Sequence, residues 1–371
     1  MTKANVQLYP IGVTKDIGVE SKATIKTDFN KDKIPTFVSF NVSAPRPKID
    51  VQGAVSWANG FNVSLDKVIA PKNNFSGHVK IDNQLNSDIV LKGESWNMSE
   101  LFDMPIFKRT PPETHATGEV KEQIANVQIA PPDIVLDVDL KTVILNVQKP
   151  LKFLQMSGHR KGYRWHHLNV SAMGSKPLEI HYIPQNRILK GESDDLGDLL
   201  ARLNATERFF GGKMRINAKQ NTTGSFIGDI TVRQFNLKDP GFIIQAVTIL
   251  GIVDGIRGKE LNFKQAKIPF ELTPYQNVYI QDGFASGTSL GLTFKGRVSL
   301  SKLALSGQVI PAYMINSLPG KIPLIGNLFK DGAGGGLIGV RYELTGTAFQ
   351  PQVNFNTLGS IAPGALGGLF Q

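Results

Sequence analysis

Residues 290–300 read Leu290-Gly291-Leu292-Thr293-Phe294-Lys295-Gly296-Arg297-Val298-Ser299-Leu300. Large apolar residues and one glycine occupy the even-numbered positions, whereas most odd-numbered positions are polar or charged. Successive side chains of a β-strand point to opposite faces of its sheet. The alternation therefore predicts a strand with one apolar and one hydrated face. The same pattern recurs at 134–140, 226–232, 263–272 and 340–344.

Turn signals separate these predicted strands, at Asn30-Lys31-Asp32, at Lys72-Asn73-Asn74 and at 220–224. Strand patterns follow one another without helical patterns between them over most of the chain, which favours antiparallel pairing over parallel βαβ units. We therefore expect a mainly β protein. An open sheet of about 18 strands coils rather than staying flat, so the fold class we predict is an elongated, curved antiparallel sheet whose apolar face forms a groove, with a few short helices toward the C-terminus.

Three segments break the strand pattern and predict helices. Ser193–Leu203 opens with a capping residue and acids and closes on Arg202, which is typical of a short helix. Residues 240–256 carry a wide apolar stripe, which fits a helix packed on the sheet or one that touches a membrane. Residues 311–329 are interpreted as a helical end-cap.

An internal repeat links two distant segments. Leu91-Lys92-Gly93-Glu94-Ser95 and Leu189-Lys190-Gly191-Glu192-Ser193 are identical and both run into acidic and apolar residues. We predict that each copy is a strand ending at glycine, followed by a short helix that begins on serine, within an elongated array. The predicted organisation is a strand-rich repeat region over 1–188 and a C-terminal region over 189–371.

Composition narrows the possible functions. The 371 residues include 41 Lys and Arg against 31 Asp and Glu, for a net charge of +10, but only 19% are charged and there is no cysteine. The absence of cysteine excludes disulfides, thiol catalysis and thiolate metal sites. No apolar run is long enough for a spanning helix, and the first residues show no signal-peptide pattern. The positive net charge allows two kinds of binding partner. Nucleic acid is a weak interpretation, because few residues are charged, and anionic lipid remains open.

Motifs for catalysis or cofactors are incomplete. Gly334, Gly336 and Gly339 have dinucleotide-motif spacing, but a strand pattern rather than a helix follows, so we interpret the loop as a connector. The six histidines form no metal-binding motif, and adjacent His166 and His167 are expected to face opposite ways on a strand. The basic and aromatic segment 159–167 is interpreted as a hairpin with its tip at 161–162, or as a binder of phosphate or anionic headgroups. We expect no enzyme activity, no metal and no cofactor.

The C-terminal half carries an ordered series of Pro and Gly landmarks. They are Gly287–Leu292, Gly296–Leu300, Gly307–Asn316, Ile322–Leu328, Tyr342–Thr347, Pro351–Phe355 and Ile361–Leu366. From Leu203 to Gln371 this series resembles the C-terminal region of the AsmA-like envelope proteins (the AsmA/YhdP/TamB superfamily). The two repeats are similar to acidic-leucine segments that recur upstream in that family, with Met98 and Ser99 departing from the pattern.

The resemblance implies a curved β-sheet with an apolar groove in the periplasm of a Gram-negative cell, anchored to the inner membrane by an N-terminal helix and implicated in phospholipid movement to the outer membrane. Because this chain lacks that anchor, we expect it to be a C-terminal fragment. Its expected partners are phospholipid acyl chains, a membrane reached through the anchor or the end-cap, and a further envelope protein, but no nucleic acid.

From these patterns we predict two sets of site residues. The groove-lining residues are Ile230, Val232, Phe263, Phe270, Leu290, Leu292, Phe294, Val298, Leu300 and Val340, with Lys295, Arg297 and Arg341 facing water. The end-cap residues are Pro311, Tyr313, Pro323, Leu324 and Gly326. The alternative function is an interaction protein that assists outer-membrane protein assembly by pairing client strands with its sheet edge.

Overall fold

The structure of the protein is a computed structural model. It describes residues 6–8, 13–15, 18–57, 59–100, 130–238, 260–287, 290–299, 304–313, 342–346 and 351–355. The strands are β1 (Val6–Leu8), β2 (Val13–Lys15), β3 (Lys22–Phe29), β4 (Pro35–Ala44), β5 (Ile49–Ser56), β6 (Phe61–Ala70), β7 (Asn73–Ile81), β8 (Ser87–Asn97), β9 (Ile134–Ile144), β10 (Leu151–Lys161), β11 (Arg164–Met173), β12 (Pro177–Ile183), β13 (Ile188–Ser193), β14 (Phe209–Gln220), β15 (Phe226–Lys238), β16 (Glu260–Leu272), β17 (Asn277–Gly287), β18 (Leu290–Ser299), β19 (Ala304–Tyr313), β20 (Tyr342–Gly346) and β21 (Pro351–Phe355). One helix, α1 (Leu196–Arg202), lies between β13 and β14.

The strands β3 to β21 form one open sheet in which each strand pairs with the next in the chain, so the prediction of a mainly β, mainly antiparallel fold is confirmed. One neighbouring pair is not antiparallel: β8 and β9 run parallel, with Ser87 opposite Ile134 and Asn97 opposite Ile144. A separate two-stranded pair is formed by β1 and β2. Among the described residues, no helix has the length and apolar character needed to cross a lipid bilayer.

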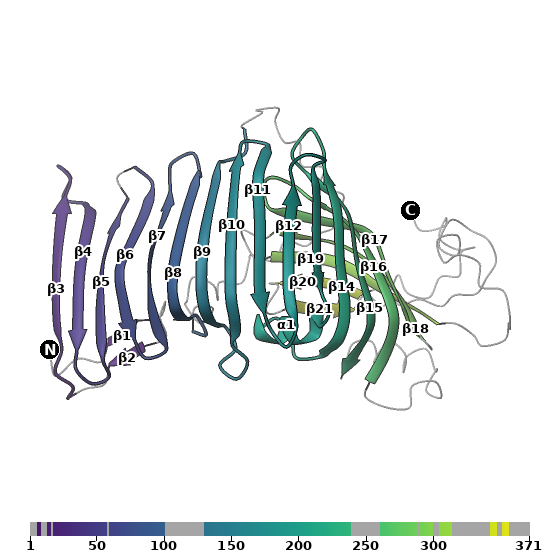
Figure 1. Cartoon of the computed structure of the whole chain (residues 1–371), viewed down its shortest axis with the longest axis horizontal. Helices are drawn as coiled ribbons and strands as arrows, with labels where there is room; N and C mark the ends of the chain where they lie inside the picture. The colour runs from purple at the N-terminus through teal and green to yellow at the C-terminus, as the bar shows by residue number, and fades with distance from the viewer. Residues whose placement is uncertain are drawn as a thin grey trace.

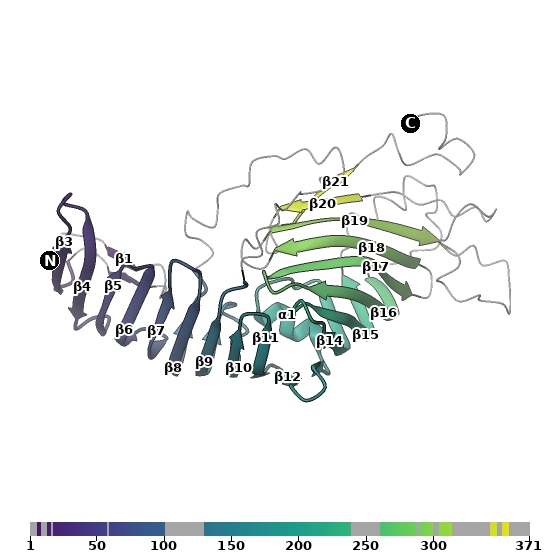
Figure 2. The same cartoon turned by 90° about the horizontal axis from the view of Figure 1, so that it is seen from above.

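The sheet is extended over its first half and curls back over its second half (Figure 2). Strands β3 to β12 form a gently twisted row, and β17 to β19 lie opposite β10 to β12 on the concave side (Figures 1 and 2). Helix α1 lies on that concave side, at the lower ends of the strands in Figure 1. Curling is the expected behaviour of a wide sheet, because each strand is twisted relative to its neighbour.

The cross-strand register places an unbroken row of apolar residues and glycines on the concave face. Residues directly opposite each other on neighbouring strands share a face of the sheet. From β3 to β16, the members of the row are Ile25, Phe40, Gly53, Leu65, Gly77, Leu91, Val138, Met156, Val170, Ile180, Gly191, Ile216, Ile230 and Ile268. One face of the sheet is thus apolar across most of its width, which is what the alternating pattern predicted.

The opposite, convex face is polar and bears ion pairs between neighbouring strands. Lys92 on β8 pairs with Asp137 on β9 at 2.6 Å, and Lys267 on β16 pairs with Asp229 on β15 at 3.4 Å. Lys295 and Arg297 are exposed, as predicted. Such exposed pairs contribute at most about 1 kcal/mol each, so they keep this face hydrated more than they stabilise the fold.

The repeat has the same structural role in both copies. Leu91 and Leu189 are each 7% exposed on the concave face, and the glutamates of the two copies pair outward with the following strand. These outward pairs are Glu94 with Lys141 at 2.7 Å and Glu192 with Arg215 at 3.2 Å. The repeat is therefore a strand with leucine and glycine inward and lysine and glutamate outward.

The predicted ends of the repeats were wrong. Both strands run past their glycine, β8 as far as Asn97 and β13 as far as Ser193. The short helix after the second copy is confirmed as α1, but its N-cap is Asp195, whose carboxylate accepts a 3.0 Å hydrogen bond from the backbone N–H of Asp198. Strand pairing with Met214 holds Ser193 in β13, and Asp194 pairs with Arg215 at 3.5 Å, so Asp195 caps the helix.

The C-terminal expectations are only partly within the described residues. Pro311 and Tyr313 lie in β19, opposite Leu292 and Leu290 of β18, and not in a helical end-cap. Their strand position extends the pairing of the preceding residues 304–310. The other end-cap residues, Pro323, Leu324 and Gly326, the predicted helix over 240–256, and Leu300, Val340 and Arg341 all lie outside the described residues.

Candidate functional site: the apolar concave face

Buried side chains on the concave face form three hydrophobic clusters. One spans β4 to β12 and includes Val68, Leu140 and Leu199 of α1. A second lies under the curled part and includes Val232, Phe235 and Phe263. A third lies nearer the opposite strand ends and includes Tyr182, Phe226 and Phe270. The rings of Phe209, Phe235 and Phe263 stack in series, with centroids 4.8 and 5.0 Å apart, an arrangement that adds to the energy of simple burial.

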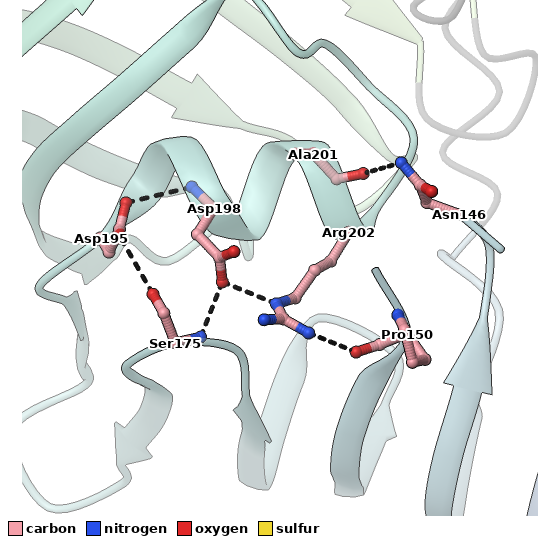
Figure 3. A network of polar contacts seen from close by, with 7 residues as sticks. All are labelled: Asn146, Pro150, Ser175, Asp195, Asp198, Ala201 and Arg202. Carbon is pink, nitrogen blue, oxygen red and sulfur yellow. Dashed lines mark hydrogen bonds and ion pairs between the residues drawn. The ribbon is translucent and has the colours of Figure 1, made fainter. Parts of the chain in front are cut away.

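Helix α1 closes one end of the concave face. Its Leu196 contacts both the first and the second cluster, and its Leu199 and Ala201 are buried. Polar contacts fasten the helix to two hairpin turns (Figure 3): Asn146 donates to the carbonyl oxygen of Ala201 at 3.1 Å, and the backbone N–H of Ser175 donates to Asp198 at 2.7 Å. The helix is therefore held against β9 to β12.

An ion pair within α1 completes that network. Arg202 Nε lies 2.6 Å from Asp198 Oδ2, and the same guanidinium also donates to the carbonyl oxygen of Pro150. Burial alone would raise the pKa of Asp198, but hydrogen bonds from Arg202 and Ser175 outweigh it and hold that pKa below its ordinary value. The carboxylate of Asp198 thus stays charged while it binds the helix to the turn.

A buried arginine joins the two arms of the curl at the other end. Arg160 of β10 is 3% exposed and donates to the carbonyl oxygens of Pro274, at 2.8 Å, and Pro132, at 2.7 Å. Its guanidinium carbon lies 5.7 Å from the centre of the Trp165 ring. Burial lowers the pKa of Arg160, and the nearby Asp133 opposes that shift. Arg160 lies on an apolar face because its guanidinium reaches across the concave side to the turn that contains Pro274.

A glutamine makes a second connection beside it. Gln220 accepts a 2.8 Å hydrogen bond from the hydroxyl of Tyr182 and donates to the carbonyl oxygens of Tyr163, at 3.0 Å, and Gly224, at 3.2 Å. Gln220 is 4% exposed, so its side-chain amide forms hydrogen bonds with protein groups rather than with water. The β10–β11 turn is thereby attached to the β14–β15 turn.

The predicted lining residues fall into two groups. Val232, Phe263, Phe270 and Leu292 are buried in the second and third clusters, where they contact protein. Ile230, Phe294 and Val298 are half-buried, and Leu290 lies in β18. The structure brings Val232, Phe263 and Leu292 together in one cluster with Phe294 and Ile230 packed against it. Several predicted lining residues therefore gather in the curled half, where they are covered by other parts of the protein.

The apolar face continues over β3 to β12, from which sequence reasoning named no lining residue. There the row residues Phe40, Leu65 and Met156 are half-buried, and Ile25 is 65% exposed. The signal was present, because Val38, Phe40 and Val42 alternate with serine and asparagine along β4 just as the apolar residues do along β18.

The histidines show a local correction. His159 pairs with His167, and Arg160 pairs with Trp165, so His166 is an extra residue in a β-bulge. The bulge removes the strict alternation: the rings of His166 and His167 both lie near His159, with centroids at 4.9 and 6.4 Å. The prediction that the two rings face opposite ways was wrong. The predicted hairpin is confirmed, but its tip is at Gly162 and Tyr163, one residue later than predicted. No group of three metal-binding side chains that could hold an ion is found among the described residues.

Among the described residues, a shallow depression of about 400 Å³ lies on the convex face across β9 to β12. Two outward rows border it, and the backbone of Val138, Met156, Val170 and Ile180 forms its floor. The first row is Asp139, Gln155, Ser171 and Glu179, and the second is Asp137, Ser157, Asn169 and His181. Its open form and short side chains give a ligand little enclosure, so we do not place the site there.

Comparisons with models of protein families, with curated proteins and with solved structures find no match to this chain.

Proposed function

We propose that this protein binds phospholipid acyl chains along the apolar concave face of its sheet, as the periplasmic part of a bridge-like protein that moves phospholipid between the inner and outer membranes of a Gram-negative envelope. The observation that carries the proposal is the unbroken row from Ile25 to Ile268, which crosses every strand from β3 to β16. This apolar face is wider than the protein needs to form a hydrophobic core. On β3 to β12 many of its residues are only half-buried.

The physical basis is the transfer of hydrocarbon out of water. Each methylene that an acyl chain buries gains about 0.8 kcal/mol, and a row that is apolar on every strand from β3 to β16 lets the chain slide along it without losing a fixed partner. In this proposal the concave face is an apolar groove. The polar convex face, on the other side of the sheet, stays in contact with water. No catalytic group or cofactor is required, because no covalent bond is made or broken.

Two neighbouring positions on β10 provide a matched test. Met156 points to the concave face between Val138 and Val170, and Ser157 points to the convex face beside Asp137. Native mass spectrometry and lipid extraction of the purified full chain should find bound phospholipid in the wild type and in Ser157→Asp. Met156→Asp should retain at least about tenfold less, since a carboxylate on the path is costly to desolvate.

Circular dichroism of both variants checks that the sheet still forms. Equal lipid retention by Met156→Asp and Ser157→Asp, or a wild-type protein that binds no phospholipid, would contradict the proposal.

A second function is supported by the edge of the sheet. β3 pairs only with β4 among the described strands, and it carries Ile25 and Phe29 at 65% and 60% exposure. An unpaired edge with exposed apolar side chains can accept an added strand. In this alternative the protein assists outer-membrane protein assembly by holding client strands. Ile25→Lys should then abolish capture of an unfolded outer-membrane protein, whereas Ile34→Lys in the adjacent turn should not.

A further inference from the structure

Four hairpin turns along one rim of the extended half of the sheet are basic, while Glu20, before β3, and Glu100, after β8, lie at the same strand ends. The hairpin turns β4–β5, β6–β7, β9–β10 and β11–β12 lie along the lower edge in Figure 1. They carry five basic residues and no acidic residue: Arg46, Lys48, Lys72, Lys149 and Lys176. We call these five residues the basic rim. All five are exposed, and none lies within ion-pair distance of a carboxylate in the part of the chain that the structure describes. Their charge is therefore available to a partner.

The opposite rim of the same strands differs in charge. The turns β3–β4, β5–β6, β7–β8 and β10–β11 contain two lysines and two aspartates, which are Lys31, Lys33, Asp32 and Asp82. The four turns of one rim are thus uniformly positive, while those of the other balance to zero. A general excess of lysine over the whole surface does not explain this difference between two ends of the same strands.

Exposed apolar side chains accompany the basic rim around β9 to β12. Val147 in the β9–β10 turn is 56% exposed, Phe153 near the start of β10 is 60% exposed, and Met173 at the end of β11 is 39% exposed. Lys152 lies directly opposite Met173 in the sheet. Phe153 also has a φ of 50°, a backbone conformation that is unfavourable for a bulky residue. A strained aromatic residue kept in water is costly unless something binds it.

The polar network of α1 fixes the two turns that carry this patch. Asn146 and Pro150, which flank Val147 and Lys149, are both bonded to α1, and Ser175, next to Lys176, is bonded to Asp195 and Asp198 (Figure 3). Fixed turns present their side chains with little further loss of conformational entropy on binding. The lysines and apolar tips are thus displayed together on a rigid support.

We propose that the basic rim and its apolar patch, Val147, Phe153 and Met173, bind the surface of a bilayer that contains anionic phospholipid. The lysines and arginine would lie at the level of the headgroups, where each contributes to the attraction, and the three apolar side chains would enter the boundary between headgroups and acyl chains. The sheet would then meet the membrane with its strand ends, and the edge of the apolar concave face on β3 to β8, beyond α1, would lie at the bilayer.

The apolar side chains distinguish a bilayer from nucleic acid as the partner. A phosphate backbone also attracts lysine and arginine, but it offers nothing for Val147 and Met173 to enter. This proposal goes beyond lipid transport and does not depend on it, since surface binding involves the strand ends rather than the row on the concave face.

Sedimentation of the full chain with vesicles tests the proposal. The probe is a vesicle of phosphatidylcholine that contains about 30% phosphatidylglycerol. The protein should bind this vesicle at least about tenfold more tightly than a vesicle of phosphatidylcholine alone. Raising the salt concentration should weaken binding. The double variant Lys149→Glu with Lys176→Glu should lose at least tenfold in affinity, and Val147→Ser with Met173→Ser should lose a smaller factor at every salt concentration.

The matched control is Lys31→Glu with Lys33→Glu on the opposite rim, which makes the same change in net charge and should bind like the wild type. Equal losses for the two charge-reversed variants would mean that only net charge matters and would overturn the proposal. So would equal affinity for neutral and anionic vesicles, or binding of duplex DNA through Lys149 and Lys176 without binding of anionic vesicles. Phospholipid retention should respond to Met156→Asp but not to the rim variants, so failure of either proposal is recognised separately.

Discussion

The Nη1 atom of Arg160 donates a 2.8 Å hydrogen bond to the carbonyl oxygen of Pro274, 114 positions later in the chain. This contact joins β10 to the β16–β17 turn across the concave side, so the two arms of the curl are connected directly and not only through the strands between them. With Pro132 as its second acceptor, the buried guanidinium joins β10 to two other segments of the chain.

Replacing this arginine should loosen the curl. We expect Arg160→Met to lower the free energy of unfolding by about 2 kcal/mol, because two charge-assisted hydrogen bonds are lost and two carbonyl oxygens are left without their donor. Hydrogen exchange should rise in residues 273–277. Arg164→Met, at an exposed position four residues on, is the control that removes the same charge, and an equal effect there would contradict the role of the contact.

The Asp198–Arg202 network should make stability depend on pH. The pKa of Asp198 is lower in the folded protein than in the unfolded chain, so its contribution is complete above the unfolded pKa and is lost as the pH falls through the folded pKa. Asp198→Asn should therefore destabilise the protein at neutral pH, and the difference from the wild type should shrink in acid. Thermal melts between neutral and acid pH measure this, with Asp194→Asn as the exposed comparison.

The two glycines of the repeat should differ in their tolerance of alanine. A methyl group at Gly93 would lie 2.4 Å from the carbonyl oxygen of Asn74 and 2.5 Å from the Cα atom of Phe75, which are backbone atoms. At Gly191 it would meet only the side chains of Ile216 and Ile180, at 3.0 and 3.1 Å. Gly93→Ala should destabilise by about 2 kcal/mol or more and Gly191→Ala by clearly less. Equal denaturation midpoints would show that the backbone at β7 yields.

Phe153 should show a trade between stability and binding. Asparagine tolerates a positive φ better than phenylalanine, so Phe153→Asn should raise the free energy of unfolding by up to about 1 kcal/mol. The same variant should bind anionic vesicles more weakly, because an apolar contact is removed. Urea denaturation and vesicle sedimentation of one preparation measure both effects. A variant that gains stability and keeps full vesicle binding would place Phe153 outside the membrane contact.

The sheet was predictable wherever alternation was regular. The pattern at 290–300 predicted β18 to within a residue, since alternation is regular there and Leu292 and Phe294 both pack in the second cluster. The bulge at His166 was not predictable, because it depends on the register with β10 rather than on local sequence. The same holds for Ser193, which is a good helix cap in isolation but is taken up by pairing with Met214.

The candidate site was only partly predictable for a similar reason. Alternation shows which residues share a face, but Phe263 and Phe270 are seven positions apart and both buried, because consecutive exposed residues at Lys264 and Gln265 break the alternation. It does not show which part of that face the curl and α1 cover, because covering depends on contacts between residues far apart in sequence. Arg160, which makes one such contact, is an isolated charge in an apolar pattern, and no local feature indicates its acceptor at Pro274.

The parallel pairing of β8 with β9 divides the chain into two meanders, since every other neighbouring pair in the sheet is antiparallel. Its ladder is formed between segments 47 positions apart, from Ser87 to Ile134, and must close a longer loop than a hairpin does, so it should form late in folding. Two molecules that meet before this ladder closes can each donate the second meander to the first meander of the other. Such a domain-swapped dimer retains every hydrogen bond of the monomer. Exchange between copies should therefore begin at the parallel pairing of β8 with β9.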